Sequence, residues 1–113
     1  MSREFKFRVY SFIDKEFIYF DIYDYPQGIA GGVSETQQFT GLIDKNGKEI
    51  CEGDILIYNN YSIGQVIYEA DHGGYIFQWK QNGPNQNYIN LNCDVAFESV
   101  IVGNIFENPE LLK

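Results

Sequence analysis

The sequence predicts a mainly β domain: a small, partly open barrel of SH3-like type with an N-terminal β extension. Aromatic residues make up 17% of the 113 residues, and aromatic side chains favour strands. No long stretch has helical periodicity. We expect at most one short helical turn near the C-terminus, over residues 108–112, and consider residues 94–100 too short to stand alone. A strand beginning at Gly53 and Asp54 favours the SH3-like type by analogy.

The length suits one domain, which we divide into N-terminal strands with a loop (1–33) and a barrel-like core (34–113). In the first part, apolar residues alternate with Lys6 and Arg8, the pattern of a strand with one face in solvent. Residues 17–23 are nearly all apolar, which predicts a second strand that is covered on both faces.

The most specific local signal is the turn Asp-Lys-Asn-Gly at residues 44–47, between two short strands. Asp at the first position and Gly at the last suit a type I turn that is closed by a left-handed glycine. A three-residue loop of this kind sets Asp44 opposite Lys48, an attractive pair. A two-residue loop would instead set Lys45 against Lys48. We therefore predict the three-residue loop.

Three stretches together resemble the YopX family, small proteins encoded by bacteriophages and prophages, mainly of Gram-positive bacteria. Residues 38–55 contain Gln-Phe-Thr-Gly-Leu, then Asp-Lys-Asn-Gly-Lys-Glu-Ile, then Glu-Gly-Asp-Ile. Residues 3–8 resemble the usual opening of the family, and residues 102–111 resemble its usual close. The resemblance implies a phage accessory protein and brings no catalytic residue with it.

Seven residues of the central stretch carry most of the resemblance, and we interpret them as scaffold rather than as a binding site. At such a bend Gly53 supplies backbone freedom and Asp54 bonds neighbouring amides. Glu52 and Asp54 could instead bind a cation or perform acid–base chemistry. The seven signature residues are Thr40, Gly41, Asp44, Gly47, Glu52, Gly53 and Asp54.

An aromatic hairpin is predicted over residues 63–80. Its second strand alternates Tyr75, Phe77 and Trp79 with other residues, so these three share one face. Together with Tyr88 they form a candidate partner-contact surface, able to anchor a protein or to stack on nucleic-acid bases. The other use of such aromatic residues is to fill the core of a small β domain.

The chain is acidic, with a formal net charge of −8 and a pI of about 4.4. Because Lys and Arg supply most of the affinity for phosphate backbones, this charge disfavours nucleic acid as a partner. Arg3, Lys6 and Arg8 could form a local basic strip, but we interpret them as a solvated strand face. An acidic protein could also mimic nucleic acid and occupy a basic host protein.

Residues able to perform catalysis or bind metal are sparse. His72 lies in a Gly-rich turn, and turn geometry is enough to explain it. We expect no metal and no cofactor, and we interpret Cys51 and Cys93 as two buried free cysteines. The chain has neither a signal-peptide pattern nor an apolar run of membrane-spanning length, so we expect a cytoplasmic protein in the host cell.

These observations predict a non-enzymatic phage or prophage accessory protein that acts through protein–protein interaction and self-assembly. An acidic, aromatic-rich β domain with exposed strand edges suits a homo-oligomer, or docking on a host or phage protein. Two alternatives stay open: a single-stranded nucleic-acid-binding β-barrel, and an acidic nucleic-acid mimic that inhibits a basic host protein.

Overall fold

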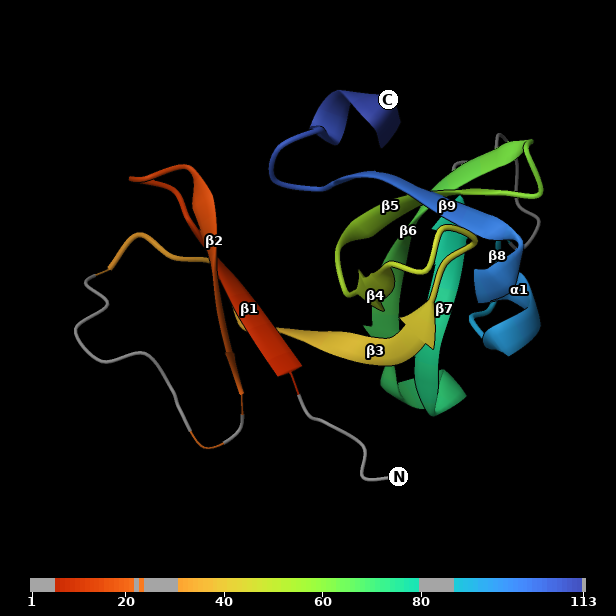
Figure 1. Cartoon of the computed structure of the whole chain (residues 1–113), viewed down its shortest axis with the longest axis horizontal. Helices are drawn as coiled ribbons and strands as arrows, with labels where there is room; N and C mark the ends of the chain where they lie inside the picture. Colours follow the sequence, from red (N-terminus) through yellow and green to blue (C-terminus); the bar gives the residue numbers. More distant parts are fainter. Residues whose placement is uncertain (1–5, 22, 24–30, 80–86, 113) are drawn as a thin grey trace.

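The computed structural model describes residues 6–21, 23, 31–79 and 87–112, and over these residues the fold is mainly β, as predicted (Figure 1). The strands are β1 Lys6–Ser11, β2 Glu16–Asp21, β3 Gln37–Ile43, β4 Glu49–Cys51, β5 Asp54–Tyr58, β6 Ser62–Glu69, β7 Gly74–Trp79, β8 Tyr88–Asn90 and β9 Ser99–Asn104. Short helical segments accompany them: the 3-10 turns η1 Ala70–His72 and η2 Pro109–Leu112, and the α-helix α1 Cys93–Phe97.

The strands form two antiparallel sheets, with the orders β2-β1-β3-β4 and β8-β7-β6-β5-β9. β3 belongs to both parts of the molecule, because Gln37 and Gln38 pair with β1 whereas Phe39 and Ile43 pair with β4. Figure 1 shows β3 running from the β1–β2 hairpin into the barrel-like part. The N-terminal strands therefore extend the sheet of the central hairpin.

Main-chain hydrogen bonds connect the two sheets at both ends of the central hairpin. At the bend after β4, the N–H of Gly53 donates to the carbonyl of Val66 at 2.8 Å, and the N–H of Ile105 donates to the carbonyl of Gly53 at 2.9 Å. At the hairpin turn, the N–H of Lys45 donates to the carbonyl of Ser99 at 2.8 Å. Full closure into an SH3-like barrel stays a prediction.

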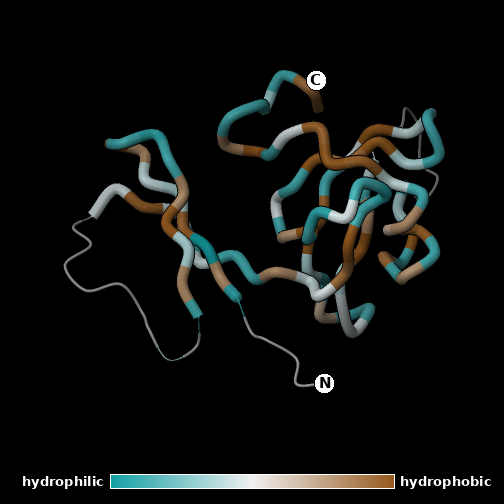
Figure 2. Tube along the Cα trace, viewed as in Figure 1, coloured by the Kyte–Doolittle hydropathy of each residue, from teal (hydrophilic) through white to brown (hydrophobic). Residues whose placement is uncertain are grey.

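The core lies on the inner face of the five-stranded sheet. Val66 on β6 is paired with Phe77 on β7, and both side chains are fully buried. Figure 2 shows hydrophobic residues running along the strands of this part. The other buried members of the core are Ile50, Leu56, Leu91, Val95 and Ala96.

The C-terminal helical turn that we expected is present as η2. Two further helical segments, α1 and η1, were not expected. α1 overlaps the stretch 94–100 that we considered too short, and it forms because its first turn is capped and its inner side is buried. The Asn92 side chain accepts the N–H of Val95 at 2.9 Å, and Val95 and Ala96 pack in the core. η1 is the turn between β6 and β7. Within the described ranges, no helix is long and apolar enough to cross a membrane.

The turn between β3 and β4 has the predicted three-residue loop. The N–H of Asp44 donates to the carbonyl of Lys48 at 2.8 Å, and the N–H of Gly47, which has φ 82°, donates to the carbonyl of Asp44 at 3.0 Å. The buried Asp44 carboxylate accepts the N–H groups of Asn46 and Lys48 at 2.9 Å and of Ile101 at 3.0 Å. This one side chain therefore ties the hairpin to β9.

Gly53 and Gly47 allow a matched test of the bend. Both have φ 82°, which costs an L-residue about 1–2 kcal/mol. A Cβ at Gly53 would also collide with the Gln37 side chain, whereas a Cβ at Gly47 would meet open space. We expect Gly53→Ala to lower the free energy of unfolding by about 1–3 kcal/mol more than Gly47→Ala, measured by urea denaturation. Equal losses would show that the contact with Gln37 does not restrict the bend.

Candidate interaction site

Arg8, which we expected on a solvated strand face, is buried where the N-terminal β1–β2 hairpin meets the barrel-like part. Only 5% of its surface is exposed. Its Nε donates to Oε1 of Gln37, and its Nη2 donates to Oδ1 of Asp54, each at 2.9 Å. Nη2 also donates to the carbonyl of Glu52 at 3.0 Å. The guanidinium lies over the ring of Phe17, 4.2 Å from its centroid, in cation–π geometry.

The expectation was wrong because both faces of β1 are covered. Val9 and Tyr10, which follow Arg8 and point to opposite faces, are both buried, so the alternation does not separate a buried face from a solvated one. Lys6, at the start of the strand, is partly exposed and forms an ion pair with Glu49 at 3.2 Å. The two cations of β1 thus have different roles.

Asp54 completes the bend between β4 and β5. Its Oδ2 accepts the N–H of Cys51 at 2.8 Å, while its Oδ1 accepts a hydrogen bond from the Arg8 guanidinium. Burial raises the pKa of Asp54, and the charge of Arg8 opposes that shift. Burial also raises the pKa of the half-buried Glu52. Asp54 therefore shapes the bend as predicted, and the described part of the chain contains no group of three or more potential metal ligands.

An aromatic cluster packs the β1–β2 hairpin against the segment that follows β9. Tyr10 stacks on Phe106, with ring centroids 5.0 Å apart and planes 5° apart. Phe17 meets both rings edge-on, with centroid distances of 5.0 Å to Tyr10 and 6.1 Å to Phe106. Each such pair contributes about 0.5–1.5 kcal/mol beyond the burial of area. Aromatic packing and the Arg8 ion pair therefore both hold the β1–β2 hairpin against the rest of the molecule.

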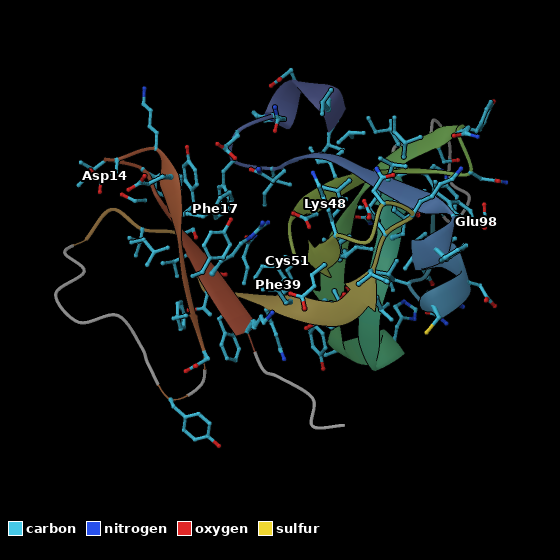
Figure 3. All side chains as sticks on the ribbon, in the orientation of Figure 1. Asp14, Phe17, Phe39, Lys48, Cys51 and Glu98 are labelled. Carbon is cyan, nitrogen blue, oxygen red and sulfur yellow. The ribbon has the colours of Figure 1, made fainter. Side chains whose placement is uncertain are left out.

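A cleft of about 420 Å³ lies between the hairpin and the barrel-like part, and we call it the hairpin cleft. Phe17 and Tyr19 line it from β2, Phe39 from β3, and Lys48 and Val102 from the barrel side. Figure 3 shows Phe17 on the hairpin and Lys48 across from it. A second hollow of about 500 Å³ shares Tyr19 and Phe39. Tyr19, 62% exposed, borders both hollows.

The predicted partner-contact residues lie away from this cleft. Tyr75, Phe77 and Trp79 share one face of β7, but that face packs against the core. Phe77 is fully buried, which corrects its prediction as a contact residue, and Tyr75 and Trp79 are half-buried. Tyr88 is half-buried beside the exposed His72, with ring centroids 4.7 Å apart. Strand alternation identifies a common face but not the elements that cover it.

The signature residues make internal contacts of the kind that a scaffold needs. Besides Asp44, Gly53 and Asp54 described above, Thr40 donates its hydroxyl to the carbonyl of Ile50 at 2.9 Å. The Glu52 N–H donates to the carbonyl of Gln38 at 3.1 Å, and Gly41 is exposed on β3. Tyr19, which lines the cleft, was missed because residues 17–23 were expected to be covered on both faces. Phe39, which also lines it, was noted only as part of the signature stretch.

The two cysteines differ in exposure. Cys51 is fully buried, as predicted, and burial raises the pKa of its thiol. Cys93 is exposed in the first turn of α1, so the prediction that it is buried was wrong. α1 packs Val95 and Ala96 into the core, whereas Cys93, its first residue, stays exposed.

Comparison with known proteins supports the resemblance noted in the sequence. A family model described as YopX protein matches residues 21–113. The chain belongs to the YopX family. No curated protein matches it significantly. Among solved structures, protein EF1440 from Enterococcus faecalis is similar over 99% of this chain and 100% of its own, with 24% identity and a TM-score of 0.65. At this identity the likeness shows a shared fold, which includes the N-terminal hairpin of this YopX-family chain.

Arg8 and Lys6 provide a matched pair of substitutions on one strand. Arg8→Met leaves the Asp54 carboxylate buried without its cation, which typically costs about 3–5 kcal/mol. Lys6→Met removes a partly exposed ion pair, which is worth less than about 1 kcal/mol. We expect urea denaturation to show this difference, and Arg8→Met with Asp54→Leu to recover part of the loss. Equal, small losses for the two single variants would contradict the buried role of Arg8.

The two thiols should differ in reactivity in the folded YopX-family protein. Because the thiolate is the reactive form, burial and the raised pKa protect Cys51, while Cys93 is accessible. We expect an aromatic disulfide reagent at neutral pH to modify one thiol quickly and the second only after denaturation. Cys93→Ser should remove the fast phase. A fast phase that persists in Cys93→Ser would show that Cys51 is not protected.

Proposed function

We propose that this protein is a non-enzymatic accessory protein of phage or prophage origin that acts by binding other proteins and copies of itself. The observation that supports this best is Tyr19, an exposed aromatic residue on an edge strand that borders the hairpin cleft. An aromatic side chain beside a hollowed surface is a typical anchor of protein interfaces. β8, at the edge of the other sheet, offers a second edge where copies could pair.

Charge favours this proposal over nucleic-acid binding. Lys6 and Arg8 are paired with Glu49 and Asp54, so they add little positive potential beside the aromatic residues of the cleft. The net charge of −8 acts in the same direction. The single-stranded nucleic-acid alternative rests on the exposed ring of Tyr19, and the nucleic-acid mimic alternative rests on the net charge alone.

The proposal is tested by capture of partners from host lysate on tagged protein, with and without nuclease. We expect a stoichiometric protein partner that survives nuclease, and roughly thirtyfold weaker binding with Tyr19→Ser, because interface anchors carry about 2 kcal/mol or more. Tyr61→Ser is the matched control, since Tyr61 is 91% exposed on the turn between β5 and β6.

Recovery of nucleic acid, or loss of every partner on nuclease treatment, would contradict the proposal and favour the nucleic-acid alternative. A partner of strongly basic composition would favour the mimic alternative. For the self-assembly part, light scattering at micromolar concentration should give a mass above that of the 13.1 kDa monomer. A monomer at every concentration would contradict that part.

A further inference from the structure

β2 is an open edge of the first sheet. It ends the order β2-β1-β3-β4, and among the described residues no strand pairs with its outer side. Its sequence, Glu-Phe-Ile-Tyr-Phe-Asp, has aromatic and aliphatic residues in the middle. It contains neither Lys nor Pro, which commonly blunt natural edges, and its only charged residues stand at its two ends. An edge of this kind can accept an additional strand.

The main-chain groups that β2 directs outward follow from the pairing of β1. Tyr10 uses its N–H and carbonyl to bond Ser34, each at 2.9 Å, on the side of β1 away from β2. In an antiparallel ladder, residues alternate between the two neighbours. Phe17 lies opposite Tyr10 and Tyr19 lies opposite Arg8, so Phe17 and Tyr19 both direct an N–H and a carbonyl to the outer edge.

The same two residues connect the edge to the hairpin cleft. The side chains of Phe17 and Tyr19 line the cleft, while their main-chain groups face the open side of the sheet. A strand added to β2 would therefore gain hydrogen bonds from the main chain and would lie beside a hollow that can take its side chains. This combination supplies affinity and side-chain selectivity together.

Charge indicates which kind of strand can be added. Glu16 and Asp21 are both exposed and stand at the two ends of β2. Two copies paired antiparallel along β2 would bring Glu16 and Asp21 of both copies to one edge, where like charges repel. Lys or Arg opposite these carboxylates is instead attractive. The net charge of −8 likewise favours a basic partner over a second copy.

We propose that the outer edge of β2 binds an extended segment of another protein, apolar in the middle and with Lys or Arg at both ends, by antiparallel strand addition. The inference rests on the proposed function and adds to it the chemistry of the partner. Self-association then uses a surface other than β2.

The test is a nuclear magnetic resonance titration of the full chain with two synthetic peptides of the length of β2. Both have Val-Thr-Val-Thr in the middle, one with Lys at both ends and the other with Glu at both ends. We expect the Lys-ended peptide to shift the amide signals of Phe17 and Tyr19 and to bind roughly tenfold more tightly, from two cross-strand charge pairs. Replacing Glu16→Lys and Asp21→Lys together should reverse the preference.

A matched pair of variants separates strand addition from side-chain contact. Tyr19→Pro removes an outward N–H and leaves the bonds between β1 and β2 in place, whereas Tyr19→Thr keeps that N–H. With unchanged circular dichroism and thermal midpoint, we expect binding of the Lys-ended peptide to be lost in Tyr19→Pro and weakened but retained in Tyr19→Thr, which removes the ring and keeps the N–H. If Tyr19→Pro does not fold, hydrogen-exchange protection of the Tyr19 amide on peptide binding gives the same information.

Three outcomes would overturn the inference: equal binding of the two peptides, shifts confined to residues away from β2, or binding that Tyr19→Pro leaves intact. Wild-type β2 amide signals that move with protein concentration alone would show that a second copy occupies the edge, which also overturns it. If the peptides fail while capture from lysate still depends on Tyr19, the proposed function stands and only the strand-addition inference falls.

Discussion

The position of the N-terminal hairpin depends on one buried ion pair, between Arg8 on β1 and Asp54 at the bend after β4. Removing two charges from water is costly, and a buried pair is tolerated only when the remaining polar groups are also bonded. Here the Arg8 guanidinium also reaches Gln37 and the carbonyl of Glu52, and Asp54 also accepts the N–H of Cys51. A hairpin placed differently would leave a charge buried without a partner. The pair therefore specifies an orientation more than it adds stability.

That orientation creates the surface on which the functional proposals rest. With β1 held against the bend and paired to β3, β2 becomes the outer strand of its sheet. The Phe17 ring packs against the Arg8 guanidinium, while Tyr19 stays exposed beside the cleft. The cleft and the open edge are thus two consequences of one internal constraint, which is why both involve residues of the same strand.

The pairing of Lys6 and Arg8 with carboxylates also affects the net charge of the outer surface. Two of the eight Lys and Arg residues, Lys6 and Arg8, bond carboxylates of the central hairpin or the bend. Most of the other carboxylates among the described residues are exposed to solvent, including those at both ends of β2. An acidic surface with an apolar edge strand is suited to a basic, extended partner, because electrostatic complementarity raises association rates and excludes like-charged partners.

The sequence by itself determined the strand-rich class and the local turns. The loop at residues 44–47 was predictable because the residues that favour its turn type, Asp44 and Gly47, lie within the loop itself. The candidate site was not predictable. Tyr75, Phe77 and Trp79 share a face as their spacing requires, but whether that face meets the core or the solvent depends on elements distant in the chain. The burial of Arg8 and the exposure of Tyr19 and Cys93 were decided in the same way, because burial is a property of packing between segments and not of local sequence.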